Sequence, residues 1–240
     1  YKLTMRILAV QNRMGIGDTV IFLPFIQAIS KKFNSPVSLL VKESSKADQF
    51  LSQTDYIDKI IFLKRDKKNK NSRHNGILGS LKLVKDIKYY NFDKILIFNS
   101  SLRYNLIAKL AGIKKIYQYP LLKKSNQHII ETAANLIKDN FNLDIDNNPS
   151  INISNDSIES TISKYNINND DLNILLGIGG SGPTKRVPSK TFLSVMEKIC
   201  NFKKCKFFLA TGKKDDEQKI LNQILNSKFR EKCIPLDDLS

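Results

Sequence analysis

The amino-acid sequence predicts an α/β protein built on parallel, doubly wound sheets, and three observations lead to this fold class. Short apolar runs that suit buried strands alternate with amphipathic stretches long enough for helices. Two of the apolar runs are followed by glycine-rich turns that precede helices. Around 142–173 the sequence becomes polar and rich in turn-forming residues, and the alternation then restarts. We therefore expect Rossmann-like domains at 1–150 and 173–240, joined by a linker at 151–172.

The first domain is expected to alternate strands and helices from its start. Ile7–Val10 is a buried strand, residues 11–17 form a turn, and Asp18 opens a helix that runs to about Phe33. The elements that follow are strands at 37–41, 57–63 and 94–98 and helices at 45–51, 78–88, 101–111 and 126–139. Alternation at this spacing favours a parallel sheet with helices on its faces.

The second domain is expected to repeat the pattern on a smaller scale. Its elements are strands at 173–178 and 206–210, a glycine loop at 179–182, and helices at 189–201 and 215–225, with 234–240 as the exit from a strand. Two strands and two helices cannot cover both faces of a parallel sheet. We therefore expect either that the chain is truncated relative to its gene product or that this half is supported by packing against something else.

Composition narrows the class of protein. With 41% hydrophobic residues the chain cannot be wholly disordered, and it has neither an apolar run of membrane-spanning length nor a signal peptide, so we expect it in the cytoplasm. The net charge of +16 suggests an anionic partner, but 32 of the 39 basic residues are Lys, which compositional drift also produces. Nucleic acid is disfavoured, because the densest basic run, at 64–70, contains no aromatic residue.

Cysteine and histidine content argues against metal and disulfide chemistry. Three cysteines occur without CxxC spacing, and the chain has only His74 and His128. We expect reduced thiols, no metal site and no cofactor.

The first candidate site is the turn Gly15-Ile16-Gly17-Asp18, between a strand and a helix. Glycines allow a close backbone approach to a ligand, and a helix N-terminus favours negative charge. The turn lacks the full dinucleotide-binding pattern, because Val20 stands at its last glycine position. Asp18 is therefore interpreted either as a helix N-cap or, at a strand's carboxyl end, as a general base.

The second candidate site is the loop from Gly177 to Pro188, which combines four glycines with Ser181, Thr184, Lys185 and Arg186. Free backbone N–H groups, hydroxyls and two cations suit a phosphate or diphosphate. The spacing is not that of a P-loop, and the alternative is a flexible connection between a strand and a helix.

Three further positions are weaker candidates. Asp215 and Glu217 follow a strand and could hold a ribose hydroxyl, or Asp215 could simply cap the next helix. His128 lies three residues before Glu131 on the helix expected at 126–139. The two side chains could form a polar contact in the cleft or only an ordinary pair on the surface. Arg103 opens a helix and could meet an anionic acceptor or only solvent.

Several of these stretches, taken in order, resemble one enzyme family. They are Met5–Val20 with its glycine-Asp turn, Pro24, Tyr56–Ile61, Phe92–Ile97 with Ser101–Arg103, Ala111–Tyr119, His128–Glu131 and, most specifically, Ser181–Pro188. The family is the heptosyltransferases, glycosyltransferase family 9, which build the inner core of lipopolysaccharide. The resemblance spans nearly all of the chain.

The resemblance implies a GT-B architecture of two Rossmann-like domains and a metal-independent transfer of heptose, or a related sugar, from a nucleotide-activated donor. It makes Asp18 the base and Lys185 the group that stabilises the leaving diphosphate, helped by Ser181 and Thr184. It gives the donor site Gly17, Arg186, Asp215 and Glu217, and the acceptor site Arg13, Arg103 and His128. The acceptor would be an anionic glycolipid, which suits a basic protein in peripheral contact with the inner membrane.

Two departures from the family keep an alternative open. Val187 stands where the family usually has Trp, and the family continues past the position of Ser240 through a further donor loop. The alternative function is a non-catalytic remnant, a folded domain that binds an anionic glycan or a protein partner.

Overall fold

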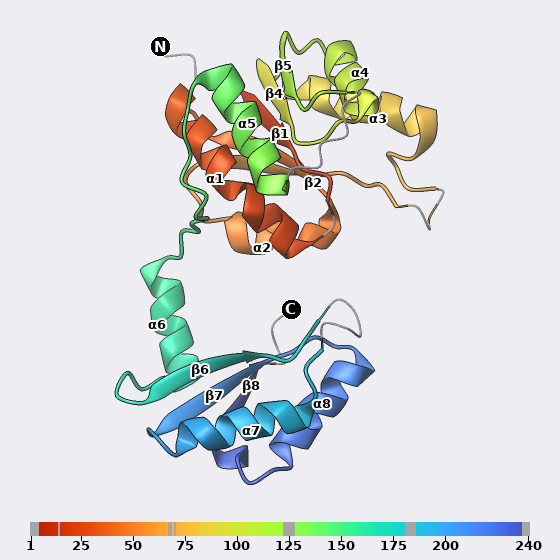
Figure 1. Ribbon diagram of the computed structural model, residues 1–240. Helices are drawn as coiled ribbons and strands as arrows, with labels where there is room; N and C mark the ends of the chain where they lie inside the picture. The colour runs from red at the N-terminus through yellow and green to blue at the C-terminus, as the bar shows by residue number, and fades with distance from the viewer. Residues whose placement is uncertain are drawn as a thin grey trace. The chain divides into compact units, whose positions relative to one another are not determined.

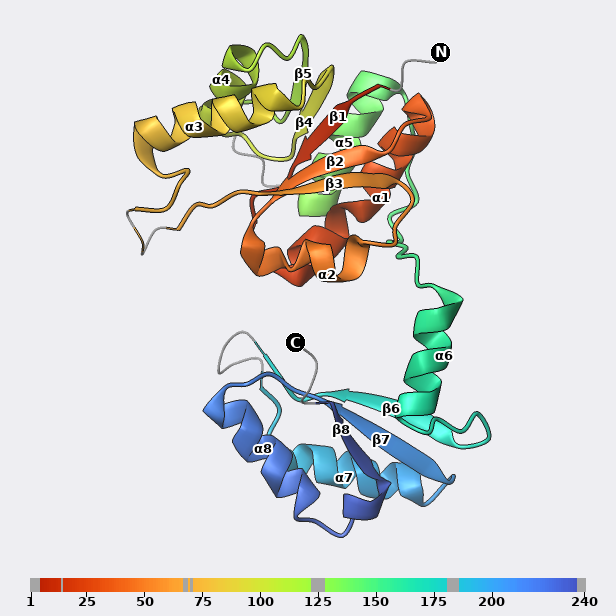
Figure 2. The ribbon, with the colours of Figure 1, turned by 180° about the vertical axis from the view of Figure 1, so that it is seen from behind.

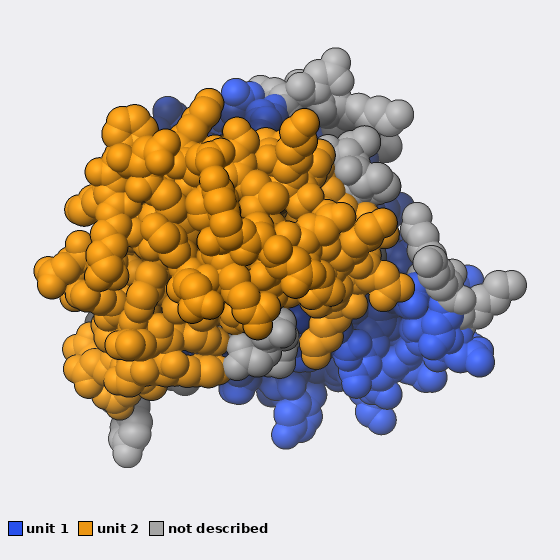
Figure 3. Space-filling view, turned by 90° about the horizontal axis from the view of Figure 1, so that it is seen from below, with its two compact units in different colours: residues 1–153 blue, residues 154–240 orange. Residues whose placement is uncertain are grey.

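The computed structural model describes residues 5–13, 15–66, 69, 71–121, 128–180 and 186–236 (Figure 1). The chain divides into two compact units, Tyr1–Ile153 and Ser154–Ser240, which Figure 3 colours separately. The Tyr56 hydroxyl donates a 2.7 Å hydrogen bond to the carbonyl oxygen of Ser150, which ties residue 150 to unit 1. The segment expected as a linker, 151–172, contains helix α6 (Asn155–Lys164), none of whose described side chains is buried.

Unit 1 is a five-stranded sheet in the order β3-β2-β1-β4-β5, and all of its pairings are parallel. The strands are β1 (Ile7–Val10), β2 (Val37–Val41), β3 (Ile57–Phe62), β4 (Lys94–Ile97) and β5 (Lys115–Gln118). The helices are α1 (Ile16–Phe33), α2 (Ala47–Leu51), α3 (Gly76–Tyr89), α4 (Leu102–Leu110) and α5 (Ile129–Phe141), with the 3-10 turn η1 (Glu43–Ser45) before α2. The doubly wound parallel fold predicted for this half is confirmed.

Helices cover both faces of this sheet (Figures 1 and 2). Because side chains alternate along a strand, Ile7 and Ala9 of β1 pack in one hydrophobic cluster with α1, α2 and α5. Leu8 and Val10 pack in a second cluster with α3 and α4. The central strand is therefore buried on both faces, which explains its unbroken apolar sequence.

Unit 2 is a smaller parallel sheet in the order β6-β7-β8. Its elements are β6 (Leu172–Gly177), α7 (Ser189–Cys200), β7 (Cys205–Ala210), α8 (Asp215–Leu225), the 3-10 turn η3 (Arg230–Lys232) and β8 (Cys233–Leu236). Phe207 and Leu209 of β7 share one cluster with residues of both α7 and α8, so both helices lie on the same face. Leu175 on the opposite face is 66% exposed.

Several predicted boundaries are wrong for local reasons. Helix α1 begins at Ile16 with Gly15 as its N-cap, so Asp18 is the third helical residue rather than the cap. The helix expected at 45–51 is divided by Lys46, whose φ of 50° is left-handed and ends the 3-10 turn η1. Residues 233–236 form a third strand, not an exit from one, so the second sheet is larger than predicted.

The three cysteines all lie in unit 2 and are free thiols. Cys200 Sγ and Cys205 Sγ are 3.3 Å apart. Burial raises the pKa of the Cys205 and Cys233 thiols to about 11. No cluster of three metal-ligating side chains occurs among the described residues. Over the same residues, no helix has both the length and the hydropathy to cross a bilayer.

Candidate functional site

Unit 1 places its candidate residues at the point where the order of its sheet reverses. From β1 the chain moves outward through β2 and β3, then returns to build β4 on the other side of β1. Val10 of β1 lies opposite Ile97 of β4, and both strands end there. The crevice at the carboxyl ends of such neighbouring strands is where open α/β sheets bind ligands.

Asp18 lies in the first turn of α1 at this edge. Its Oδ2 accepts a 3.1 Å hydrogen bond from the Gly15 backbone N–H, the reciprocal half of a capping box. Among the described residues its other carboxylate oxygen, Oδ1, has no hydrogen-bond partner. The helix N-terminus favours a negative charge at this position. The carboxylate is therefore held by one oxygen and can accept a proton on the other.

The two glycines of this turn differ in their surroundings. A Cβ on Gly15 would lie 3.2 Å from Asp18 Oδ2, so a side chain there would crowd the carboxylate. Gly17 is exposed and has no atom within 4 Å of its Cβ position, so the space beside it is open to a ligand.

Gln11 holds the turn from the buried side, a role that no sequence pattern predicted. Its side chain is 2% exposed and its Nε2 donates to the carbonyl oxygen of Asp18 at 2.9 Å. Its Oε1 accepts from the backbone N–H of Arg13 at 2.6 Å. One buried amide thus links both ends of the turn and orients Asp18.

A second group of amides lines the same edge. Asn99 Oδ1 accepts from the Ser101 N–H at 2.9 Å, and Asn99 Nδ2 lies 3.5 Å from Asn12 Oδ1. Gln118 Nε2 donates to the carbonyl oxygens of Asn99 and Ser101, both at 3.0 Å, while its Oε1 accepts from Asn105 Nδ2 at 2.8 Å. These neutral side chains hold the loops after β1 and β4 together.

Two predicted acceptor residues, Arg13 and His128, also lie at this edge. Arg13 is exposed, and its positive charge partly opposes the burial that raises the pKa of the Tyr119 hydroxyl well above its ordinary value. That hydroxyl is buried, and no described residue forms a hydrogen bond with it. His128 is the N-cap of α5, where its Nδ1 accepts from the Ile130 N–H at 3.4 Å, so its expected place within a helix is wrong.

Arg103 stands apart from that group. It lies in the first turn of α4, and its guanidinium donates a hydrogen bond to the carbonyl oxygen of His74. Burial, together with the positive charge of Arg65, lowers the pKa of Arg103. The side chain is half-buried and points toward α3, and the prediction that it contacts an anionic acceptor stays a prediction.

His74 is itself a buried anchor for this region. The Lys64 N–H donates to its Nδ1 at 3.0 Å, so its proton sits on Nε2, 3.0 Å from Asp86 Oδ2. Arg73 pairs with the same carboxylate at 2.5 Å, and this pairing lowers the pKa of Asp86. Burial lowers the pKa of His74, which Asp86 opposes.

In unit 2 the candidate site is organised by Glu217. This residue is in the first turn of α8, is 4% exposed, and its Oε1 accepts from the Gly180 N–H at 3.2 Å. A Cβ on Gly212 would lie 2.3 Å from Glu217 Oε2, so a side chain there would displace the carboxylate from its present place beside the loop after β7. The carboxylate thus lies between the loops that follow β6 and β7.

The glycine loop after β6 is anchored to the same helix turn at a second point. Arg186, whose side chain is only 16% exposed, pairs with Asp216 Oδ2 at 2.5 Å, while its Nε is buried and has no hydrogen-bond partner in the described part of the chain. The predicted phosphate ligands Ser181, Thr184 and Lys185 lie outside the described residues. Their neighbours on either side, Gly180 and Arg186, both contact acidic residues of α8.

Asp215 does not have the position predicted for it. Lys214 is the N-cap of α8, and Asp215 is the first helical residue and exposed. Of the two acidic candidates on this helix, Glu217 is the one that contacts the described glycines of these loops.

Searches for similar proteins find likeness in structure and not in sequence. No protein-family model and no curated protein sequence matches the chain. A glycosyl transferase family 9 structure from Veillonella parvula superposes with a TM-score of 0.76 at 18% identity, covering 100% of this chain and 72% of that one. Escherichia coli ADP-heptose LPS heptosyltransferase II gives 0.73 at 16% identity, covering 98% and 73%. E. coli heptosyltransferase WaaC, solved with ADP, gives 0.67 at 13% identity, covering 98% and 76%.

The fold is that of the heptosyltransferases. The superpositions run along the whole chain, so they include the strand ends that carry Asp18 in unit 1 and Glu217 in unit 2. The fold class predicted from the sequence, two Rossmann-like parts with a smaller second sheet, is confirmed.

Proposed function

We propose that the chain is a glycosyltransferase that moves a heptose, or a related sugar, from a nucleotide-activated donor to a lipopolysaccharide core acceptor. The observation that carries this proposal is the Asp18 carboxylate. It lies at the β1–β4 reversal, held by Gly15 on one oxygen, in a chain with the fold of heptosyltransferases. The position and the partly open environment suit a general base.

The proposed reaction is a single displacement. The acceptor hydroxyl attacks the anomeric carbon of the donor sugar, and its proton passes to the free oxygen of Asp18. The bond from that carbon to the diphosphate oxygen breaks, and the nucleoside diphosphate leaves with the bonding electrons. Gln11 supports this step by fixing the backbone of the turn, as its bonds to Asp18 and Arg13 indicate.

The donor is assigned to unit 2. We assign the leaving diphosphate to the loop with Ser181, Thr184 and Lys185, supported by the free Nε of Arg186 at its end. We assign the donor ribose to Glu217 rather than Asp215, because Glu217 faces the glycine loops and Asp215 is exposed. The WaaC structure was solved with ADP, which supports a nucleotide in this fold.

The acceptor is assigned to unit 1. Arg13 and His128 are the proposed contacts to an anionic sugar acid or phosphate, with Tyr119 as an added hydroxyl whose hydrogen-bonding capacity is unused. Arg103 is left out of this set, because its guanidinium points toward α3.

The decisive experiment replaces Asp18 by Asn in an assay with nucleotide-activated heptose and a lipopolysaccharide core acceptor. Turnover should fall by roughly 10²- to 10⁴-fold, the usual contribution of a general base. Donor binding and melting temperature should stay near those of the parent chain, because Asn can still accept from Gly15.

The matched control is Asp93→Asn. Asp93 also accepts a backbone hydrogen bond, from Arg6 at 2.8 Å, but it precedes β4 and lies at the opposite edge of the sheet. It should leave turnover unchanged. Equal turnover in the Asp18 variant and this control would reduce Asp18 to a helix-capping residue, and donor binding without any transfer would favour the non-catalytic alternative.

A further inference from the structure

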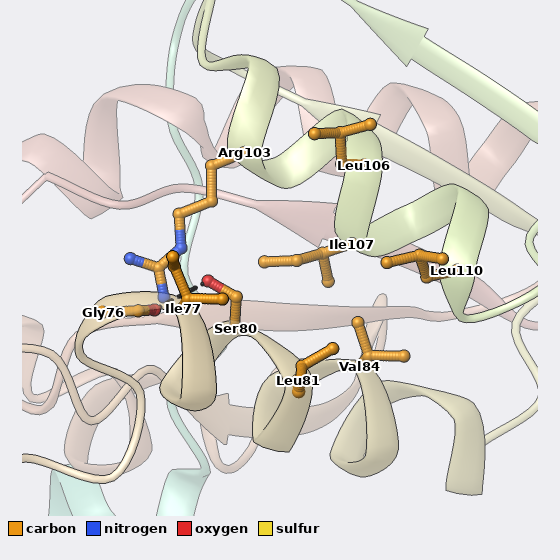
Figure 4. Close-up of a pocket in the computed structure, with 9 residues that line it drawn as sticks. All are labelled: Gly76, Ile77, Ser80, Leu81, Val84, Arg103, Leu106, Ile107 and Leu110. Carbon is orange, nitrogen blue, oxygen red and sulfur yellow. Dashed lines mark hydrogen bonds between the residues drawn. The ribbon is translucent and has the colours of Figure 1, made fainter.

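An apolar groove runs between α3 and α4, the two helices that cover one face of the sheet of unit 1. Its volume is about 440 Å³. Ile77, Leu81 and Val84 of α3 face Leu106, Ile107 and Leu110 of α4 across it (Figure 4). The three α3 residues recur at helical spacing, so they form one stripe along that helix.

The groove is not closed over by other described parts of unit 1. Ile77 is 82% exposed and Leu110 is 61% exposed, and beside the groove Leu78 and Leu102 are 75% and 57% exposed. Single exposed apolar side chains are ordinary, but a contiguous apolar patch on paired helices marks a surface that binds something apolar.

Three basic residues border the groove by their places on the two helices, Lys85 and Lys88 of α3 and Arg103 of α4. The one acidic residue of these helices, Asp86, is already paired with Arg73 and His74. By helical periodicity Lys88 continues the stripe of Ile77, Leu81 and Val84, and Lys85 lies beside it. An apolar stripe bordered by lysines, in a chain of net charge +16, is complementary to an anionic, apolar partner.

Arg103 closes one end of the groove. Its Nε is buried and has no hydrogen-bond partner among the described residues, although its Nη2 donates to the His74 carbonyl oxygen. A guanidinium with unused donors beside an apolar slot fits a phosphate carried on a hydrocarbon chain.

We propose that the α3–α4 face, defined by the six groove residues together with Lys85, Lys88 and Arg103, docks on an anionic phospholipid bilayer. Apolar side chains enter the interface, and the lysines and Arg103 meet lipid phosphates. The basic rim favours a lipid surface over a protein groove-binder, which would need matching acidic residues. The inference deepens the proposed function, because an acceptor carried on a lipid would lie at the bilayer on which this face docks. Only this link to the acceptor rests on the proposed function; the docking itself does not.

The experiment is vesicle co-sedimentation of the full chain without donor or acceptor. The chain should bind vesicles of mixed phosphatidylglycerol and phosphatidylethanolamine, bind phosphatidylcholine at least about tenfold more weakly, and release in high salt. Ile77→Gln with Leu110→Gln should weaken binding about tenfold, since exposed apolar area is what enters the interface. Lys85→Gln with Lys88→Gln should weaken it by a similar factor.

Two control variants distinguish docking by this surface from non-specific binding of exposed apolar side chains and from an effect on catalysis. Val195→Gln with Phe202→Gln removes two apolar side chains of unit 2, 43% and 89% exposed, and should leave vesicle binding unchanged. Asp18→Asn should also bind vesicles normally, so a failed transfer assay would not bear on docking. The proposal is overturned if the groove and lysine variants bind like the parent chain, if neutral vesicles bind equally well, or if the groove variants lose only self-association.

Discussion

The two units of this chain bury their sheets in different ways. In unit 1, helices pack on both faces, and β1 is buried along its whole length between two hydrophobic clusters. In unit 2, α7 and α8 share one face, and β6 alternates between partly buried and exposed positions. The difference teaches that one sequence signal, a strand between helices, produces either a sandwiched or a one-sided sheet. The apolar pattern along the strand tells them apart.

The strand-end loops of the two units also differ in what holds them. In unit 1 the neutral amides of Gln11, Asn99 and Gln118 bridge backbone groups around Asp18. In unit 2 one buried carboxylate, that of Glu217, faces two glycine loops. Amides can hold a reactive carboxylate without adding charge, whereas a carboxylate among glycine loops calls for cations or hydroxyls to complete its surroundings.

The substitution with the largest expected effect tests whether unit 2 supplies the positive charge that stabilises the leaving diphosphate, while unit 1 supplies the general base. Lys185→Ala should cost about 2 to 4 kcal/mol in transition-state stabilisation and weaken donor affinity, with a near-parental melting temperature. Arg186→Ala should also lower the stability of unit 2, because Arg186 is mostly buried against Asp216. Steady-state kinetics, donor titration and melting curves measure these effects.

The control for that comparison is Lys190→Ala, an exposed lysine in the first turn of α7. It should behave like the parent chain in all three measurements. If Lys185→Ala binds and turns over donor normally, the diphosphate does not lie on this loop.

A matched glycine pair gives the next largest effect. A Cβ at Gly79 would lie 2.3 Å from the backbone carbonyl carbon of His74, and one at Gly212 would lie 2.3 Å from Glu217 Oε2. The backbone cannot yield cheaply, so Gly79→Ala should destabilise unit 1 by about 2 kcal/mol despite the better helix propensity of Ala.

Gly212→Ala should cost only about 1 kcal/mol, because the tip of a side chain can move away, yet it should weaken donor binding by displacing Glu217. Urea unfolding followed by hydrogen exchange assigns each loss to a unit. Equal losses in the two variants would show that the loop of unit 2 is as rigid as the backbone around His74.

A third pair compares the two kinds of support directly. Gln11→Leu keeps the volume but leaves the Asp18 carbonyl and the Arg13 N–H without their partner, which should cost about 1 to 2 kcal/mol and reduce turnover. Glu217→Gln keeps an acceptor for Gly180 and should cost about 1 kcal/mol or less, with its main effect on donor affinity. A larger stability loss from Glu217→Gln than from Gln11→Leu would reverse this part of the comparison.

The smallest expected effect is a loss of stability of unit 1 at acidic pH. Burial lowers the pKa of His74, so below about pH 6.5 the unfolded chain binds a proton that the folded chain resists. The unfolding free energy of unit 1 should therefore fall as the pH drops from 7.5 to 5.5. Unit 2 contains no histidine and should change less over this range. Hydrogen exchange at the two pH values resolves the units.

Histidine variants identify the source of that acid sensitivity. His74→Gln should flatten the pH dependence of unit 1, whereas His128→Asn, which keeps a capping side chain at α5, should leave it in place. An unchanged slope in the His74 variant would assign the acid response to other groups.

The sequence predicts well those elements whose buried residues form a recognisable pattern within one short segment. Strand β1 and helix α8 have the predicted bounds, since one is a continuous apolar run and the other a regular amphipathic stretch after acidic residues. Strand β8 was missed because Pro235 lies inside it, where proline usually argues against a strand. Its pairing with β7 is a long-range contact that no local pattern encodes.

The sequence indicated which candidate residues follow strands, but not which side chains hold them in place. Glycine turns after strands identified Asp18 and Glu217, because the carboxyl ends of parallel strands meet at one edge. The N-cap assignments to Asp18 and Asp215 were wrong, because the cap is set by where backbone torsions turn helical, at Gly15 and Lys214. Gln11 and Gln118 could not be found, since an amide is ordinary in sequence until its partners are known.

The sheet of unit 1 also separates two populations of side chains that share no members. Phe22 on one side and Ile107 on the other exchange no contact within their clusters, so the effects of substitutions there should add. Each face can then accumulate compensated replacements without reference to the other. One face of this sheet could therefore be repacked by design while the side chains on the other face are left unchanged.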